Sequence, residues 1–405
     1  MTEHERAPVA RMLGHLDQDI ADHPRDRAGD PVNDLDELAS RGMQQARQRR
    51  LVLQRLDGSS LPFVHARIIP FGTEATPWRV PICVKRVLPV LAAAALLAPA
   101  SEARTEGGGT PVALVTAETT NELLAISLPD GRVIKRLRMP ADPENVEATD
   151  RTAVVVSTRG AAVTLVDLRR LRVVKVLRGF GSPHIPLIGR DGRFAYVTDD
   201  ARGQLVVIDL ARRRVTRRVY VGYGAHHMTE DGPGNWLWIA LGERARSIAV
   251  VDVSNPARPR LSRRVDPLGS AHDLAFSPGS ARVWVTYGDR SQVGVFSAST
   301  GKLVRLIRAG SAPQHVLFGP AGGGGHAYVS SGDDGALRIF SARTGRLLHI
   351  ARTSYGSFNL ATYGSFVATS SLYRGTLMEF DENGHRRVTR HVAPAARDLA
   401  FATLP

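Results

Sequence analysis

The chain has 405 residues, which is enough for one large domain or for two to three ordinary ones. Its hydrophobic content of 43% is that of a globular protein, and its single cysteine, Cys83, excludes a disulfide framework and a cysteine-based zinc site. The net charge of +14 is unevenly placed: residues 1–103 hold 13 basic and 13 acidic residues, whereas residues 104–405 hold 40 basic and 26 acidic residues.

Residues 1–83 are polar and charge-balanced, and they lack the hydrophobic pattern of strands. One helix is predicted from Asn33 to Leu56, where apolar residues recur at loose helical spacing. The rest of this extension is predicted to be disordered, and no motif in it carries chemistry.

Residues 84–103 have the three parts of a secretory signal peptide. Lys85 and Arg86 supply the positive charge, residues 87–98 form an apolar run of 12 residues, and Ser101-Glu102-Ala103 is a small-x-small cleavage site. The run is too short to cross a bilayer core of ~30 Å comfortably. We therefore expect export to the periplasm or the cell surface, with no transmembrane span in the mature protein.

A signal peptide belongs at the N-terminus of a chain, yet this one begins at residue 84. We expect that translation starts at Val84 from a GTG codon, which makes residues 1–83 an over-extended start. The alternative is a cytoplasmic tail followed by a signal anchor. Residues 104–110 are a predicted linker.

Residues 111–405 carry a repeated unit. In its clearest copy, Ser182-Pro183-His184 precedes an apolar run, an Asp-Gly turn, the apolar strand 194–197 and a second apolar strand, 205–209. The position of His184 recurs at spacings of 38 to 46 residues, as Asn145, His226, His272, His315, Asn359 and Arg397. Repeats of ~40–45 residues with four short strands each indicate the blades of a β-propeller.

The strands of the repeat are almost continuously apolar, which fits burial on both faces between stacked blades. The chain enters the repeat region at a second strand, 112–115, and ends at a first strand, 398–401. We therefore predict an all-β, seven-bladed β-propeller of four-stranded antiparallel blades. In it, the C-terminal strand joins the three N-terminal strands and closes the ring, so that no blade is left open.

The unit Ser-Pro-His, followed by Phe-Ala-Tyr-Val-Thr and Leu-Val-Val-Ile-Asp-Leu, resembles the YVTN repeat of secreted, seven-bladed, YncE-like propellers. The resemblance extends over roughly residues 111–405 and is strongest at 182–222. It implies the fold and export, but no single activity, because similar blades occur in lactonases, in haem d1 propellers of nitrite reduction and in copper nitrous oxide reductase.

The first strands of such a propeller line its central channel, so the repeated position predicts a ring of side chains near one end of the channel. We call these seven the marker residues: Asn145, His184, His226, His272, His315, Asn359 and Arg397.

Three interpretations of the marker residues are open. The ring is structural or solvated, or it binds a small ligand or anion through imidazoles and arginine. In the third interpretation, His184, His226, His272 and His315 bind a transition metal such as zinc or copper. The adjacent His227 is expected to point elsewhere, because side chains alternate along a strand.

Acidic residues offer a weaker candidate site. Asp199-Asp200 and Asp333-Asp334 follow second strands and can supply calcium ligands, but paired aspartates in turns more often cap their own backbone. Glu144, Glu147 and Asp273 flank marker residues.

Arginines concentrate in the predicted outermost strands, at 132–138, 172–178, 212–218, 258–264 and 386–390. Charge on these free edges prevents edge-to-edge aggregation. The alternative is an acidic partner such as a cell-wall polymer, a phospholipid surface or a nucleic acid. A nucleic acid is disfavoured, because the basic strands run all round the rim and no aromatic residues interleave with them.

The sequence contains no Gly-x-Ser-x-Gly elbow, no His-Glu-x-x-His motif and no P-loop. It therefore predicts an exported propeller that acts as a binding or scaffold module for a protein, a cell-wall component or a small molecule. The predicted ligand site is the His-lined mouth of the channel. The alternative is a lactonase-like hydrolase or a metal- or cofactor-dependent oxidoreductase that uses the same mouth.

Overall fold

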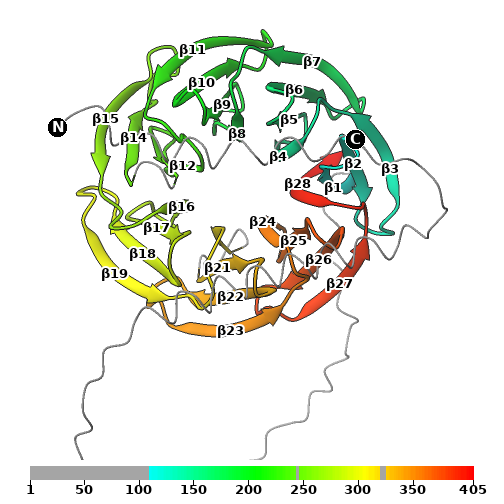
Figure 1. Ribbon diagram of the computed structural model, residues 1–405. Helices are drawn as coiled ribbons and strands as arrows, with labels where there is room; N and C mark the ends of the chain where they lie inside the picture. The colour runs from blue at the N-terminus through cyan, green and yellow to red at the C-terminus, as the bar shows by residue number, and fades with distance from the viewer. Residues whose placement is uncertain (1–108, 243–245, 320–324) are drawn as a thin grey trace, which may run out of the picture. The chain divides into compact units, whose positions relative to one another are not determined.

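The computed structural model describes residues 109–405, apart from 243–245 and 320–324. These residues form seven four-stranded antiparallel sheets that surround a central channel (Figure 1). The predicted seven-bladed β-propeller is confirmed. The predicted extension at 1–83 and the predicted signal peptide at 84–103 lie outside the described residues, as does the predicted linker except for its last two residues. Within the described part of the chain, no helix has the length and hydrophobicity that a membrane crossing requires.

The strands fall into four concentric positions. The innermost strands, which line the channel, are β28 (Ala396–Leu404), β4 (Pro143–Ala148), β8 (Pro183–Ile188), β12 (Met228–Glu230), β16 (Ala271–Phe276), β20 (Val316–Phe318) and β24 (Ser357–Tyr363). The second strands are β1 (Thr110–Ala117), β5 (Thr152–Ser157), β9 (Phe194–Asp199), β13 (Trp236–Ala240), β17 (Arg282–Tyr287), β21 (His326–Ser331) and β25 (Phe366–Ser371).

The third strands are β2 (Glu122–Ser127), β6 (Ala162–Asp167), β10 (Gln204–Asp209), β14 (Ile248–Asp252), β18 (Gln292–Ser297), β22 (Ala336–Ser341) and β26 (Thr376–Asp381). The outermost strands are β3 (Val133–Arg138), β7 (Arg172–Arg178), β11 (Arg214–Tyr220), β15 (Arg260–Val265), β19 (Leu303–Arg308), β23 (Leu347–Arg352) and β27 (Arg386–His391).

The ring is closed by strands from both ends of the described chain. We number as blade 1 the sheet in which β28 pairs with β1, and as blades 2 to 7 the sheets from β4–β7 to β24–β27. In blade 1, Thr110 lies opposite Leu404 and Ala113 lies opposite Phe401. The predicted closure, with one C-terminal strand completing three N-terminal strands, is confirmed.

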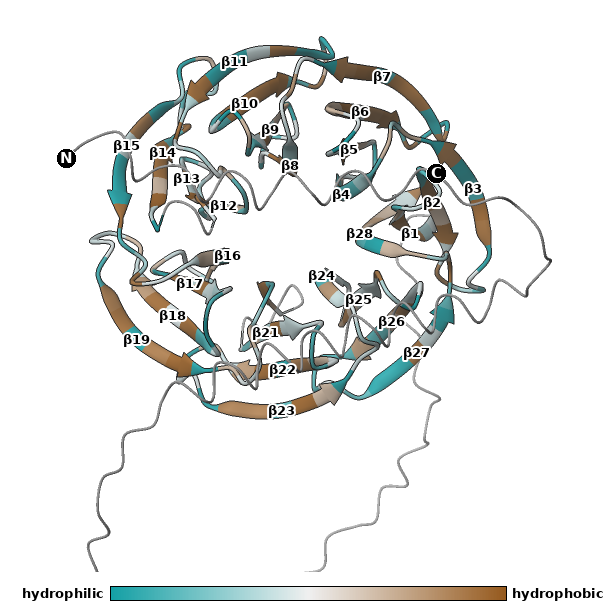
Figure 2. Cartoon of the chain, in the orientation of Figure 1, coloured by the Kyte–Doolittle hydropathy of each residue, from teal (hydrophilic) through white to brown (hydrophobic). Residues whose placement is uncertain are grey.

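The hydrophobic core lies between the blades. Seven clusters of buried side chains each join two neighbouring blades. In blade 3, Val197 and Val206 pack toward blade 2, whereas Tyr196 and Leu205 pack toward blade 4. Because both faces of the middle strands are buried, these strands are apolar along their length, as Figure 2 shows for β6, β10 and β18.

Hydroxyl groups at the ends of six of the seven second strands join their blade to the next around the channel; β13 of blade 4 has none. Thr198, the threonine of Tyr196-Val197-Thr198, donates a hydrogen bond to the carbonyl oxygen of His226 in the next blade (2.6 Å) and accepts one from the backbone of Ile185 (3.0 Å). Thr158 and Thr286 donate in the same way to the carbonyl oxygens of Pro183 and Gln314, the residues before two marker residues. The threonine of the repeat therefore fixes where the first strands, and with them the marker residues, lie.

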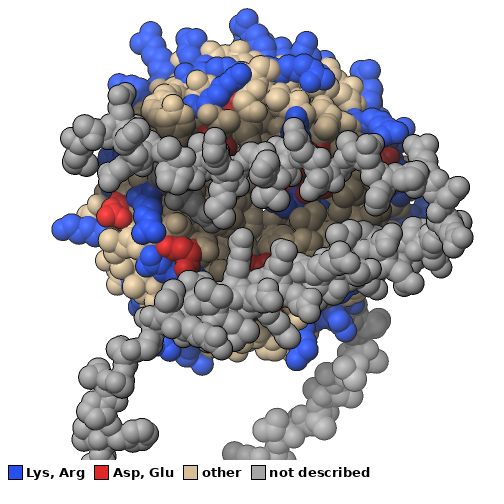
Figure 3. Space-filling view, viewed as in Figure 1, with Lys and Arg blue, Asp and Glu red and all other residues tan. Residues whose placement is uncertain are grey.

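Basic side chains occupy the rim. The arginine-rich segments of the sequence form outer strands such as β3, β7, β11, β15 and β27, and Figure 3 shows Lys and Arg side chains projecting around the edge of the disc. On β19 and β23 the same outer position also carries exposed aliphatic residues, among them Val304, Leu306 and Ile350.

Candidate functional site

The first strands are irregular where they reach the mouth of the channel. The backbone N–H of His226 donates to the carbonyl of Ala240 (2.9 Å), while the N–H of Ala240 donates to the carbonyl of His227 (2.8 Å). His226 and His227 thus both lie opposite the single residue Ala240 of β13, which is the arrangement of a β-bulge. The register also shifts between Ala271 and Leu274, where His272 and Asp273 lie. A bulge lets two consecutive side chains approach the channel.

All seven marker residues line one cavity at this end of the channel, with a volume of 510 Å³. The four marker histidines come from blades 3 to 6 and lie on one side, and His227 lies with them. Asn145, Asn359 and Arg397 come from blades 2, 7 and 1 and complete the lining.

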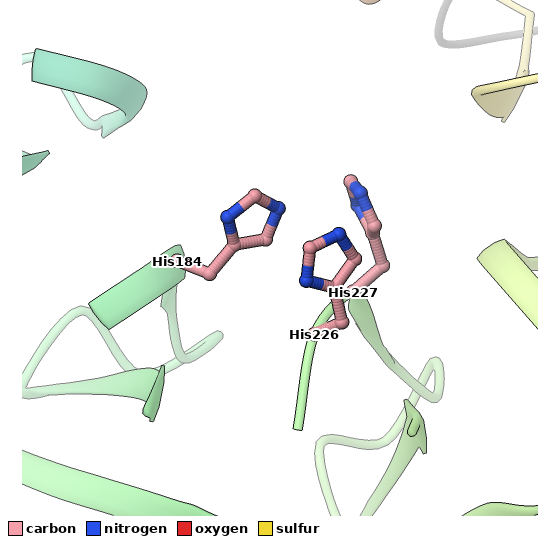
Figure 4. Close-up of side chains that lie close together, drawn as sticks. All are labelled: His184, His226 and His227. Carbon is pink, nitrogen blue, oxygen red and sulfur yellow. The ribbon is translucent and has the colours of Figure 1, made fainter. Parts of the chain in front are cut away.

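Five imidazole rings form one cluster, which we call the histidine cluster. The rings of His184 and His226 are stacked, with centroids 3.6 Å apart and planes at 9°. The ring of His227 lies at the centre, with centroid separations of 5.1, 4.8, 4.7 and 4.6 Å from His184, His226, His272 and His315. Figure 4 shows His227 beside His226 and facing His184. The prediction that His227 points elsewhere is therefore wrong, because the bulge interrupts the alternation on which it rested.

Carboxylates lie behind four of the five rings. Nδ1 of His184 is 3.2 Å from Oε2 of Glu144, and Nδ1 of His226 is 3.1 Å from Oδ2 of Asp200. Asp273 serves two rings, with Oδ1 3.5 Å from Nδ1 of His227 and Oδ2 3.5 Å from Nδ1 of His315.

A carboxylate at Nδ1 favours the tautomer in which that nitrogen carries the proton. The lone pair is then on Nε2 and is free to bind a ligand.

Four rings of the histidine cluster, those of His184, His227, His272 and His315, are neutral at physiological pH. Burial lowers the pKa of His184 to about 4 and that of His272 to about 3, and the neighbouring His226 adds to both shifts. Burial and the surrounding imidazoles hold the pKa of His227 and His315 well below the usual value for histidine. Neutral imidazole is the form that binds metal ions, so no proton has to leave these rings first.

Two groups of three rings have the spacing of a metal site. One nitrogen from each of His184, His226 and His227 lies within 4.8 Å of the other two, and the same holds for His227, His272 and His315. Three nitrogens bound tetrahedrally to zinc at ~2.0–2.1 Å are ~3.4 Å from one another. The rings of either group have to move closer together to reach this distance, and His227 belongs to both groups.

The side of the cavity across from the histidine cluster holds amides and one guanidinium. Asn359 Nδ2 donates to Asn145 Oδ1 (3.2 Å), and Asn145 Nδ2 donates to the carbonyl of His184 (2.8 Å), which ties this side to the cluster. Arg397 Nη1 is 3.8 Å from Glu118 Oε2, too far for a hydrogen bond. None of the described residues accepts a hydrogen bond from Arg397 Nε.

A second cavity of 720 Å³ continues the channel below the histidine cluster and shares His227 and His315 with the first. Four carboxylates line it, and burial raises the pKa of three of them, Glu147 to about 8, Asp273 to about 7 and Asp398 to about 6. Asp273 and Asp398 each accept a backbone hydrogen bond from the next blade, at 2.9 Å. These two carboxylates thus also join blades.

The loop aspartates cap their own backbone or contact nearby side chains. Asp199 accepts hydrogen bonds from the N–H groups of Gly181 and Ser182, each at 2.9 Å, as expected for a capping aspartate. Asp333 accepts one from Gln314 Nε2 (3.1 Å), and Asp334 pairs with Arg338.

Residues 112–232 match the model of the YNCE-like beta-propeller family, and residues 233–267 match that of the LVIVD repeat. The predicted resemblance to YncE-like propellers is confirmed. No curated protein matches the chain.

Three solved structures are similar to this chain. A functionally unknown protein from Desulfotomaculum acetoxidans is 12% identical, with a TM-score of 0.63, over 73% of this chain and 99% of that one. Apo AztD from Citrobacter koseri is 13% identical, with a TM-score of 0.58, over 73% and 98%. Dihydro-heme d1 dehydrogenase NirN in complex with DHE is 15% identical, with a TM-score of 0.52, over 70% and 64%. At such low identity the similarity shows the fold alone.

Proposed function

We propose that this YncE-like β-propeller is an extracytoplasmic binding protein that binds a divalent transition-metal ion, zinc or copper, in the histidine cluster. The observation that supports the proposal best is the cluster itself, in which five imidazoles lie together, two buried and three half-buried, and four of them have a carboxylate at Nδ1. Histidines that bind metals have this arrangement, because the carboxylate orients the ring and makes the free nitrogen a stronger ligand.

The donor set favours zinc and copper over magnesium or calcium. Neutral imidazole nitrogens suit zinc, copper, iron and nickel, whereas the hard cations need oxygen ligands. The carboxylates of Glu144 and Asp200 lie at Nδ1 of His184 and His226, and are therefore placed to orient the rings rather than to bind the ion. The extracytoplasmic location is supported by the signal-peptide pattern of residues 84–103.

The proposal is tested on the full chain after treatment with EDTA. Zinc and copper are titrated by calorimetry, and the metal retained after dialysis is measured by mass spectrometry. We expect at least one bound ion and an increase in thermal stability, because a ligand that binds only the folded state stabilises it.

Two variants separate the histidine cluster from other histidines. His227→Gln removes the ring common to both groups of three, and we expect it to weaken metal binding by at least ~100-fold. His349→Gln changes an exposed histidine on β23 and should leave binding unchanged. Metal binding that is absent from the unaltered protein, or equal in the two variants, would contradict the proposal.

A further inference from the structure

The cavity at the mouth of the channel is larger than a metal ion needs. Its volume is 510 Å³, whereas a water molecule that completes the coordination of a metal fills about 30 Å³. Cavities of ~300–1,000 Å³ are typical of sites for small organic ligands. Three imidazoles also leave at least one coordination position of zinc open. The space next to that open position can therefore hold a second ligand.

Among the polar groups that line this space, the guanidinium of Arg397 is the one with a positive charge outside the histidine cluster. None of the described residues accepts a hydrogen bond from its Nε, and its ion pair with Glu118 is long, at 3.8 Å. Burial raises the pKa of Glu118, and the charge of Arg397 opposes this shift. A guanidinium presents its donors in a planar fork, and the group that matches the fork is a carboxylate.

Arg397 and all five rings of the histidine cluster line the same cavity. Phe358 also lines it, and its ring is an apolar surface beside Arg397: the guanidinium Cζ lies 5.9 Å from the centroid of the Phe358 ring. With a metal ion in the histidine cluster, a ligand in this cavity would meet the metal on one side and the guanidinium, next to an apolar ring, on the other.

The charges of the cavity make the binding of an anion depend on the metal. Without a metal, Arg397 shares the cavity with Glu144, Asp200 and Asp333, so an added anion meets carboxylates. A divalent ion in the histidine cluster adds two positive charges opposite Arg397. An anion with two separated carboxylates can then place one on the metal and one on Arg397.

We infer that the cavity binds a small di- or tricarboxylate anion together with the metal ion, with one carboxylate on the metal and another on the guanidinium of Arg397. This inference rests on the proposed binding of metal by the histidine cluster. Because the anion and the metal stabilise each other in the cavity, each raises the affinity for the other by the same factor.

The test uses equilibrium dialysis of the full chain, metal-free or loaded with zinc, against radiolabelled citrate, with the zinc content measured in the same samples. We expect one citrate per zinc-loaded protein, and at least ~10-fold weaker citrate binding to the metal-free protein. Radiolabelled acetate, which has a single carboxylate and cannot span the metal and Arg397, should bind at least ~10-fold more weakly than citrate.

Variants locate the second carboxylate. Arg397→Gln should weaken citrate binding by about 10- to 100-fold, and Arg397→Lys, which keeps the charge but loses the planar fork, should weaken it less. Arg374→Gln changes an exposed arginine outside the cavity and should have no effect. Circular dichroism and the zinc content of each sample show whether a variant has kept its fold and its metal.

The outcomes separate the two proposals. A protein that binds zinc but retains no citrate, or whose zinc is removed by citrate, overturns the inference and leaves metal binding intact. Citrate bound equally by the metal-free protein or by the Arg397→Gln variant also overturns it. If the protein binds no zinc, the proposed function of metal binding is contradicted instead.

Discussion

Replacing Asp273 by asparagine should make the metal-free protein more stable, and increasingly so as the pH rises. Burial raises the pKa of Asp273 from 3.8 to about 7, and the charge of Asp398 adds to this shift. Between these two values the folded state holds a proton that the unfolded chain has released, so this carboxyl stabilises the fold at low pH and loses that contribution progressively as the pH rises from 3.8 to about 7. Asparagine has the same shape and keeps an oxygen for the N–H of Val316, but it cannot ionise.

The magnitude follows from about 1.4 kcal/mol for each pKa unit. Ionisation of Asp273 costs the folded state about 4 kcal/mol at about pH 8.5 but only about 1.5 kcal/mol at about pH 5. Placing the asparagine amide beside His227 and His315 also costs stability, but this cost is the same at both pH values. The difference in unfolding free energy between Asp273→Asn and the unaltered protein should therefore change by about 3 kcal/mol in favour of the variant between the two pH values.

Urea unfolding in the presence of EDTA, followed by the fluorescence of the buried Trp238 and Trp284, measures this difference. If the difference in unfolding free energy between the two proteins stays constant with pH to within about 1 kcal/mol, the argument that ionised Asp273 destabilises the fold is refuted. The same variant should bind zinc about 10- to 100-fold more weakly, because it loses the carboxylate behind two rings. Asp273 would then destabilise the metal-free protein while it orients two rings of the histidine cluster for metal binding.

Three further results are expected. Thr198→Val should cost about 1–3 kcal/mol of unfolding free energy in urea, because it leaves the buried carbonyl of His226 and the N–H of Ile185 without their partner, whereas Thr389→Val on the exposed rim should have little effect. Deletion of residues 396–405 removes β28 and exposes the edge of β1, so the truncated chain should lose its cooperative unfolding transition and elute as aggregates in gel filtration. Zinc should stay bound in dialysis down to about pH 5, because the lowered pKa values of His184, His227, His272 and His315 delay competition by protons. Release of zinc at about pH 6.5, the ordinary pKa of histidine, would contradict this.

The architecture could be predicted almost completely from the sequence. Blade number and closure follow from the spacing of one repeated position and from the fact that the described chain enters at a second strand and ends at a first. These features depend on local hydrophobic runs, and in blade 3 the runs at 194–197 and 205–209 became buried middle strands as expected.

The candidate site was less accessible to sequence reasoning. The marker histidines share one cavity, as their equivalent positions suggest, but His227 was placed wrongly because a bulge is a backbone irregularity that alternation does not reveal. Glu144 and Asp273 were predicted only to flank marker residues, and Asp200 only to be a possible calcium ligand. Their pairing joins separate blades, as between Glu144 and His184, and only the closed ring determines such distances. The signal that could have drawn attention to His227 is the doubled histidine at a marker position.

Arg397 lies on β28, the strand that completes the ring, whereas the five imidazoles belong to blades 3 to 6. A ligand that binds to Arg397 and to the histidine cluster would link β28 to blades 3 to 6. The empty protein should then open most readily at the seam between β28 and β1, and occupation of the cavity should slow hydrogen exchange at the amides of that seam before it affects any other blade.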